Sequence, residues 1–374
     1  MSFTDIADGT GTPKNQNETD QSNLRKDVED FEFTGEASEM WPIILKNLVF
    51  NVLTLSLYRF WGRTSIRNYI WKNVRFKGDP LEYLGTGAEL FTGFIIALFV
   101  IFLPLLGIGF WGQTLLLQGS GFGVLFILIA YMTLLFLLPL GIFRAQKYRL
   151  SRTRWRGIRG ALIGNGVDYA SATLGYYLLI GLTGGLAYPY VENKLWGKMT
   201  NKTRFGDGEF SYNAPSGPLY GGFLVYFGMS LIGIVLFFMI SGVSTMSASG
   251  GTPTVAISSF FFGYLTLILC MGFGYAVYLH RQLVHFWGNM KYQNCHFGFK
   301  GGLGDMIKLY VGNAFLFTVT LGLAYPITQM RFARYVMQSL KMYGDLDLTA
   351  IAQTSEEEPS YGEGLAEGFD MGTI

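Results

Sequence analysis

The sequence Thr183-Gly184-Gly185-Leu186-Ala187-Tyr188-Pro189 recurs as Thr320-Leu321-Gly322-Leu323-Ala324-Tyr325-Pro326 and, in shorter form, as Thr54-Leu55-Ser56-Leu57-Tyr58. Each version begins fifteen residues after an acidic residue: Glu39, Asp168 and Asp305. A glycine stands four residues before each acid, at positions 35, 164 and 301. Three matches in one register indicate an internal repeat.

The composition predicts a membrane protein. Half of the 374 residues are hydrophobic and 14% are charged, whereas soluble domains carry about 25% charged residues. Residues 90–143 and 210–279 contain no Asp, Glu, Lys or Arg. Each stretch is long enough for two spanning helices of about 20 residues and a connection. We therefore expect a multi-pass helical protein.

The basic residues indicate which apolar segments cross. Seven segments can be recognised, at 40–58, 88–110, 122–143, 169–188, 218–241, 256–279 and 306–326. Basic clusters follow the first, third, fourth, sixth and seventh, and the positive-inside rule places all of them in the cytoplasm. The second and third segments then form one crossing hairpin, and the fifth and sixth another. The fourth segment then has basic clusters at both ends, and a single crossing would place one of them outside. The same holds for the seventh segment and, by repetition, for the first. We therefore expect these three to form broken, re-entrant or interfacial helical pairs.

The repeats are predicted to be parallel. A unit with two crossings gives copies related by an axis along the membrane normal. We expect a first unit at 31–158, a second at 159–295 and a partial third at 296–345. The acidic stretches 1–30 and 346–374 are predicted to be disordered tails, and both termini to be cytoplasmic.

The recurring phrase is predicted to be a hinge, because Gly and Pro interrupt helices. The hinge residues would be Thr54, Tyr58, Thr183, Tyr188, Pro189, Thr320, Tyr325 and Pro326. Short cytoplasmic strands are expected beside the helical pairs, since Phe31-x-Phe33-x-Gly35 recurs as Phe297-x-Phe299-x-Gly301 with a period of two. The resulting fold class is an all-α multi-pass membrane protein with four spanning helices, three broken pairs and short strands.

Several strings resemble the YjgN-like family of bacterial inner-membrane proteins. They include Thr54-Leu55-Ser56-Leu57-Tyr58-Arg59-Phe60-Trp61, Glu82-Tyr83-Leu84-Gly85-Thr86-Gly87 and the very specific Arg152-Thr153-Arg154-Trp155-Arg156-Gly157-Ile158-Arg159-Gly160. The similarity runs over roughly residues 31–343. It implies a multi-pass protein of the inner membrane and carries no activity, because the family is defined by sequence.

Basic residues beside the apolar segments are the candidate binding residues. Seven lie within 144–159, where they either determine topology or bind anionic lipid headgroups, for which arginine is well suited. The hypothetical lipid or substrate site consists of Arg63, Arg67, Arg152, Arg154 and Arg156 with Glu39, Asp168 and Asp305. The acids also have a simpler interpretation as residues that favour the start of a helix.

Other chemistry has little support in the sequence. Gly107-Ile108-Gly109-Phe110-Trp111-Gly112 fits a dinucleotide fingerprint but follows no strand. His280, His285 and His296 lack the spacing of metal ligands. We therefore expect no metal, no cofactor, no nucleic acid partner and no enzymatic activity.

The sequence favours transport or handling of an anionic or lipidic substrate in the bacterial inner membrane, with anionic lipids as partners. A polar cavity lined by Arg63, Arg67, Arg154 and Asp168 would support this function. The alternative is a non-transporting scaffold that binds anionic headgroups through its basic face.

Overall fold

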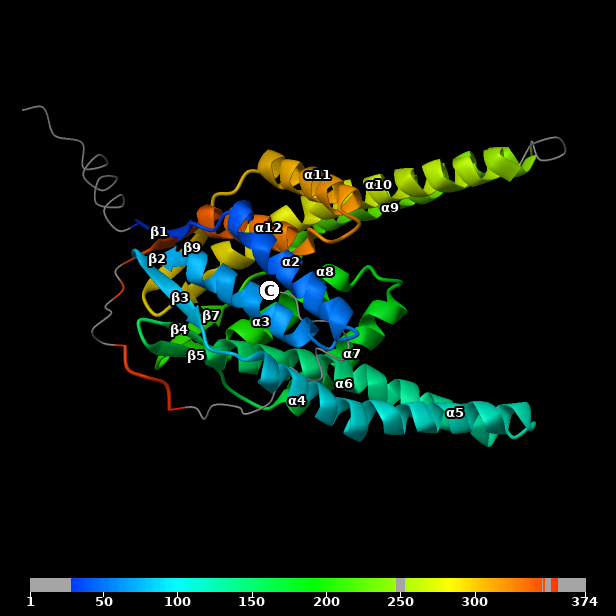
Figure 1. Cartoon of the computed structure of the whole chain (residues 1–374), viewed down its shortest axis with the longest axis horizontal. Coiled ribbons are helices and arrows are strands. Elements are labelled where there is room, and N and C mark those ends of the chain that lie inside the picture. Colours follow the sequence, from blue (N-terminus) through cyan, green and yellow to red (C-terminus); the bar gives the residue numbers. More distant parts are fainter. Residues whose placement is uncertain (1–27, 247–252, 345, 347–350, 356–374) are drawn as a thin grey trace, which may run out of the picture.

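Ten short strands form a closed barrel at one end of the molecule (Figure 1). The computed structural model describes residues 28–246, 253–344, 346 and 351–355. Around the barrel the order is β1-β10-β9-β8-β7-β6-β5-β4-β3-β2, with every pair antiparallel. The strands are β1 (Val28–Phe33), β2 (Val74–Phe76), β3 (Asp79–Tyr83), β4 (Thr153–Trp155), β5 (Ile158–Leu162), β6 (Thr203–Phe205), β7 (Gly208–Tyr212), β8 (Met290–Tyr292), β9 (Cys295–Phe299) and β10 (Leu340–Tyr343).

The prediction of an all-α protein is wrong, because this barrel is a principal part of the fold. Its strands are three to six residues long, so alternation in the sequence indicated only β1 and β9. Tight turns join them: Lys77-Gly78 and Arg156-Gly157 both have positive φ angles, as two-residue hairpin turns require. Part of the basic stretch 144–159 therefore forms a β-hairpin.

The barrel encloses an aromatic core. Phe76, Trp155, Tyr292 and Phe297 are buried inside it, while Arg75 between the buried Val74 and Phe76 points outward. Closure leaves no unpaired strand edge. This explains how strands of only three residues form a stable sheet.

A short C-terminal segment packs against the barrel. Ile351 is buried in the barrel core, and the backbone N–H of Asp207 donates to the carbonyl of Ala352 at 3.0 Å. Gln353 accepts a hydrogen bond from the Arg159 N–H and donates to the Gly157 carbonyl. The predicted disordered tails lie largely outside the described residues.

Three helical pairs extend from the barrel, each broken at the recurring phrase (Figure 1). In each pair the first helix ends at the residue before the phrase's threonine, and the second starts five residues after that threonine. The pairs are α2 (Ala37–Leu53) with α3 (Arg59–Asn73), α7 (Gly166–Leu182) with α8 (Tyr188–Thr200), and α11 (Leu303–Val319) with α12 (Tyr325–Ser339). The origin of the pairs by repetition, and the unit boundaries, stay predictions.

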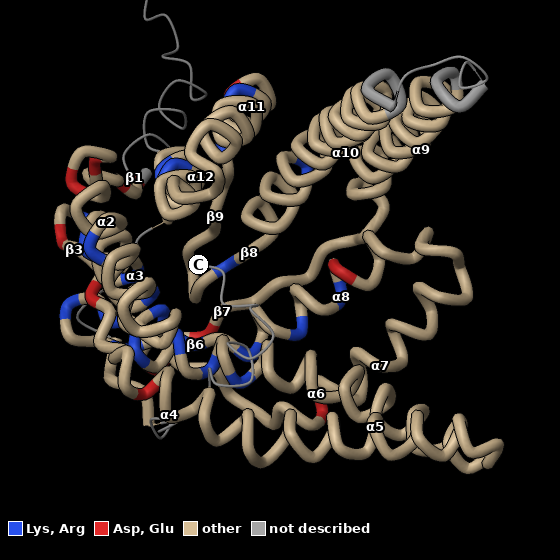
Figure 2. The backbone as a smooth tube through the Cα atoms, turned by 45° about the vertical axis from the view of Figure 1, so that its right-hand side comes forward, with Lys and Arg blue, Asp and Glu red and all other residues tan. Residues whose placement is uncertain are grey.

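Two long hairpins extend in the same direction and reach further (Figure 1). Within the described residues, four helices are long and apolar enough to cross a membrane: Gly87–Leu117, Phe122–Arg152, Gly217–Gly242 and Ile257–Gly288. The first comprises α4 (Gly87–Ala97), a π-helical turn at Leu98–Phe102 and α5 (Leu103–Leu117); the others belong to α6 (Phe122–Arg152), α9 (Gly217–Met246) and α10 (Pro253–Gly288). Figure 2 shows their outer halves free of charged residues.

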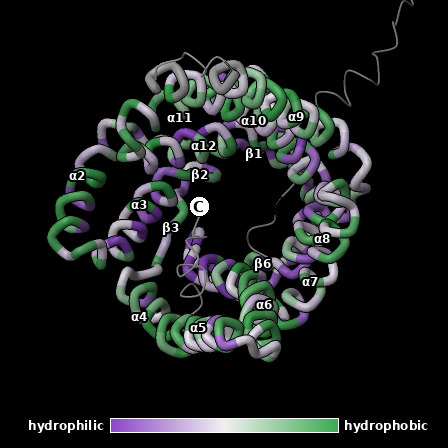
Figure 3. The backbone as a smooth tube through the Cα atoms, turned by 90° about the vertical axis from the view of Figure 1, so that its right-hand side faces the viewer, coloured by the Kyte–Doolittle hydropathy of each residue, from purple (hydrophilic) through white to green (hydrophobic). Residues whose placement is uncertain are grey.

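The helices form a ring above the barrel (Figure 3). Neighbours follow chain order, and α12 closes the ring by packing against α2 and α3. Figure 3 shows α3 and α12 on the inner side with hydrophilic residues, and α2 and α11 outside them. The outward surface of the ring is largely apolar, as expected for contact with lipid.

Candidate functional site

The threonine of each phrase bridges two helices. Thr183 Oγ1 donates to the Leu179 carbonyl at 2.8 Å and accepts from the Ala187 N–H at 3.0 Å. Thr54 and Thr320 make the same two kinds of bond in the other pairs. Tyr58, Tyr188 and Tyr325 lie where the second helices begin, and Pro189 and Pro326 lie in their first turns. The residues predicted as hinges thus form three equivalent bridged breaks; their motion stays a prediction.

The three predicted acids are exposed in the first turns of α2, α7 and α11. Glu39 accepts a hydrogen bond from the Tyr69 hydroxyl at 2.8 Å. Asp305 forms an ion pair with Lys308, 3.5 Å away on the same helix. Asp168 is exposed at the start of α7. These positions suit the simpler interpretation of acids that favour a helix start.

Arg63 and Arg67 lie on α3. Arg67 is buried, and its guanidinium donates to the Tyr83 hydroxyl at 3.1 Å and lies over the Tyr83 ring. Arg63 is partly buried. Arg67 therefore connects α3 to the barrel strand β3.

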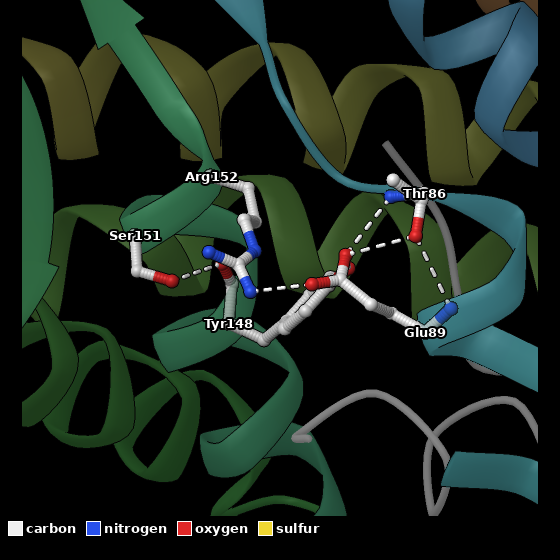
Figure 4. Close-up of polar contacts among 5 residues, drawn as sticks. All are labelled: Thr86, Glu89, Tyr148, Ser151 and Arg152. Atoms are coloured by element: carbon white, nitrogen blue, oxygen red, sulfur yellow. Dashed lines mark hydrogen bonds and ion pairs between the residues drawn. The ribbon is translucent and has the colours of Figure 1, made fainter. Parts of the chain in front are cut away.

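Arg152 ends α6 and pairs with Glu89 at the start of α4 (Figure 4). The distance between the guanidinium and the carboxylate is 2.5 Å, and the Tyr148 hydroxyl donates to the same carboxylate at 2.7 Å. Glu89 also accepts from the backbone N–H of Thr86, while Thr86 Oγ1 accepts from the Glu89 N–H, which completes a capping box. This network joins the barrel-side ends of two candidate spans.

The last two predicted arginines belong to the β4–β5 hairpin. Arg156 lies in its turn and pairs with Asp79 at 2.5 Å. Arg154 lines a cavity of about 240 Å³ inside the barrel, whose walls are mainly aromatic and aliphatic. The cavity expected from the sequence is not formed together by its four predicted residues, Arg63, Arg67, Arg154 and Asp168: of these, only Arg154 lines this barrel cavity. The predicted site residues instead belong to several separate networks.

A different site lies where α8 meets α6, α7 and α10. It is an open cavity of about 490 Å³, within the usual range for ligand pockets. Ile142, Ile180 and Leu195 form apolar parts of its wall. Its aromatic lining consists of Tyr169, Tyr177, Tyr188, Trp196 and Phe286, and its polar lining of Gln146, Glu192 and Gln282.

Glu192 is the acidic residue of this cavity. Its carboxylate accepts a hydrogen bond from the Tyr278 hydroxyl at 2.5 Å, and also from Gln282 and Tyr188. Burial raises the pKa of Glu192 above its ordinary value, and the three hydrogen bonds oppose that shift. The walls contain no Lys or Arg. The site is therefore an acid that accepts hydrogen bonds from neutral donors in an open cavity lined by aromatic side chains.

Sequence reasoning missed this site. Glu192 has Tyr188, Leu195, Trp196 and Met199 on its own face of α8, and this helical spacing of apolar residues around one acid was the available signal. Tyr278 is 86 residues away in the sequence. Only the ring of helices brings the two together.

Comparison with known proteins identifies the family. Residues 28–368 match the family described as "Bacterial protein of unknown function (DUF898)". The chain belongs to this family. It is also similar to the inner membrane protein YjgN of Salmonella typhimurium, with 22% identity over 87% of this chain and 91% of the relative. The resemblance to YjgN-like proteins is thereby confirmed, and the apolar helices agree with a protein of the inner membrane.

No solved structure matches the chain. The described residues include no group of three or more His, Cys, Asp or Glu side chains that could hold a metal ion.

Proposed function

We propose that this membrane protein binds and moves a lipid-like molecule, without covalent chemistry. The observation that carries the proposal is the cavity of about 490 Å³ around Glu192. Its walls are predominantly apolar and aromatic with a few convergent polar groups, which is the usual character of a small-molecule site. The lining lacks Lys and Arg, so it favours a lipidic over an anionic substrate.

The proposal includes a topology. Four helices cross the inner membrane, and the barrel and both termini lie in the cytoplasm. The basic residues near the barrel support this orientation, since Arg144, Lys147 and Arg149 precede Arg152 at the end of α6. Leu55, Leu182 and Leu321 at the breaks of the three pairs are 89%, 87% and 91% exposed. Such exposed leucines at equivalent tips support re-entry of the pairs into the lipid.

The proposal extends to the three pairs themselves. We propose that they are parallel copies of one unit, because their breaks share the same threonine bridge and the same order of helices. Broken helices in corresponding positions are a recurrent way in which transporters build binding sites.

Lipid movement in proteoliposomes tests the function. We expect Ile142→Trp, which fills the cavity, to reduce transfer of a fluorescent phospholipid between leaflets several-fold relative to the wild type. Ile129→Trp is the matched control, because Ile129 lies on the same helix α6 and is 46% exposed outside the cavity. Equal transfer by both variants and by protein-free vesicles would contradict the proposal.

A second function, a scaffold that binds anionic headgroups, has support from a different surface. Lys194 and Lys198 are exposed on α8 and line a shallow pocket of about 210 Å³ with Asn201 and Asn213. Lysines near a membrane surface attract anionic lipids at about 1 kcal/mol each. Loss of vesicle binding in Lys194→Gln/Lys198→Gln, together with wild-type lipid transfer no faster than in protein-free vesicles, would favour the scaffold.

A further inference from the structure

We propose that the Glu192 cavity recognises a lipophilic organic cation, an amine or quaternary ammonium group on an apolar body. The inference rests on the proposed function and names the class of its substrate. It follows from the charge, the aromatic walls and the apolar lining of the cavity.

The charge of Glu192 lacks a positive partner within the cavity. Its hydrogen-bond donors Tyr278, Gln282 and Tyr188 are all neutral, and no Lys or Arg lines the walls. Glu192 is partly buried, and a carboxylate that is withdrawn from water without a counter-charge is costly. A bound cation would supply the missing charge, so the ionised site favours cations and repels anions.

The aromatic walls favour the same ligand. Tyrosine, tryptophan and phenylalanine faces attract organic cations through their quadrupoles. Tyr177, Tyr188 and Trp196 line the cavity beside Glu192. Trp196 is stacked on Phe286, with ring centroids 4.7 Å apart and planes at 13°, so its orientation is held. The cavity therefore combines one acid with several aromatic rings.

The remaining lining selects against small inorganic cations. Divalent metals need several oxygen, nitrogen or sulfur ligands, whereas Glu192 is the only acidic residue lining this cavity and no His or Cys joins it. Ile142, Ile180, Leu195 and Met199 instead offer surface for an apolar body. A lipophilic cation would pair its charge with Glu192 and pack its apolar body against these residues.

The test compares three probes of similar size on protein in nanodiscs, with protein-free nanodiscs subtracted: cationic tetraphenylphosphonium, neutral triphenylphosphine oxide and anionic tetraphenylborate. We expect wild type to bind the cation most tightly. Glu192→Gln should weaken cation binding about tenfold or more, as expected for loss of a charged partner, and leave binding of the neutral probe unchanged. Glu192→Asp should recover part of the affinity.

Matched controls separate binding from folding. Glu82→Gln removes an exposed acid outside the cavity and should bind like wild type, and every variant is compared by its thermal melting. If Glu192→Gln melts early, Tyr177→Leu provides a second variant, with a similar loss for the cation expected.

The outcomes distinguish the two levels of proposal. Equal binding of neutral and cationic probes, unaffected by Glu192→Gln, would overturn the cation site while leaving a lipid-handling cavity. Preference for the anion would overturn it as well. Normal lipid transfer by Ile142→Trp would contradict the proposed function even if the cation binds.

Discussion

Leu55 and Ser56 occupy the first helix break with φ angles of +50° and +70°. The second break has Gly184 and Gly185 at the same place, and the third has Leu321 and Gly322. At each break three backbone N–H groups bond back to the preceding helix. Two of them, at the first break Leu55 to the Val52 carbonyl and Ser56 to the Asn51 carbonyl, form the pattern of a Schellman ending. Left-handed conformations are costly for residues other than glycine. Backbone strain is therefore greatest at the first break, where neither left-handed residue is a glycine.

Replacing Ser56 by glycine should stabilise the protein. The change removes a side chain from a left-handed position and should add about 1 kcal/mol to the free energy of unfolding. Thermal melting in detergent measures it. The reverse comparison is Gly185→Ala, at φ +91°, which should destabilise, while Gly175→Ala in the open interior of α7 should not. A lower melting temperature for Ser56→Gly would contradict this account.

Cation affinity should depend on pH through Glu192. Burial raises the pKa of this carboxyl above 4.5, so the charged form grows as the pH rises through that raised value. Burial also raises the pKa values of Tyr169, to about 12, and of Tyr177 and Tyr188. These tyrosines stay neutral near pH 7, as do Gln146 and Gln282 on the facing helices.

Tetraphenylphosphonium affinity is therefore expected to fall as the pH drops below the Glu192 pKa, by at most about tenfold per pH unit. It should stop falling at the affinity of Glu192→Gln and level off above the pKa. Titration of the dissociation constant against pH provides the measurement. Glu192→Gln should show a flat profile, and a wild-type profile that is equally flat would rule out this residue as the titrating group.

At the scale of elements, the ion pair between α4 and α6 holds the base of the first hairpin. Arg152 is 15% and Glu89 27% exposed in their side chains, so both charges are mostly removed from water. Arg204 and Glu209, on adjacent strands, form a comparable pair at 2.6 Å, but the Glu209 side chain is 70% exposed. The two pairs should therefore differ in their contribution to stability.

Glu89→Gln is expected to lower the free energy of unfolding by about 1–3 kcal/mol, because it leaves the Arg152 charge without its carboxylate. Glu209→Gln should cost less than about 1 kcal/mol. Chemical denaturation of both variants gives the comparison. Equal losses would show that burial does not set the strength of the α4–α6 pair.

The elements differ in how far the sequence could predict them. Charge-free stretches predicted the long helices, and Gly and Pro in the phrase predicted the breaks. Phe297-x-Phe299 predicted part of β9 through its alternation. The β4–β5 hairpin was missed because Thr153–Trp155 is only three residues long within a basic string. Such short strands form because the closed sheet gives each of them a partner on both sides. The local sequence contains no signal for these partners.

The site was predicted less well than the fold. The arginines were chosen for their position beside the membrane, but Arg67, Arg152 and Arg156 bond to Tyr83, Glu89 and Asp79. These partners lie 16, 63 and 77 residues away. Sequence chemistry identified groups able to bind anions, and the tertiary structure determines which of them already have intramolecular partners.

For the whole molecule, the proposed topology makes a labelling prediction. In a background with Cys270→Ala and Cys295→Ala, Asn294→Cys in the β8–β9 turn should react only from the cytoplasm. Gln118→Cys at the tip of the α5–α6 hairpin should react only from the periplasm. Both side chains are exposed. Leu321→Cys should be protected from a membrane-impermeant reagent on either side, and periplasmic labelling there would exclude re-entry.

The pairing of β1 with β10 also dictates an order of assembly. Val28 pairs with Tyr343 and Asp30 with Lys341. Strand β1 is therefore made early in translation but cannot complete its pairing until β10 has been made. Until translation reaches residue 343, the nascent sheet carries two open edges, which are prone to aggregation. The entropic cost of closing such a long loop grows only slowly with its length. The risk of aggregation therefore depends on how long the edges stay open during translation. A chain terminated before Leu340 should therefore insert its hairpins and yet fail quality control.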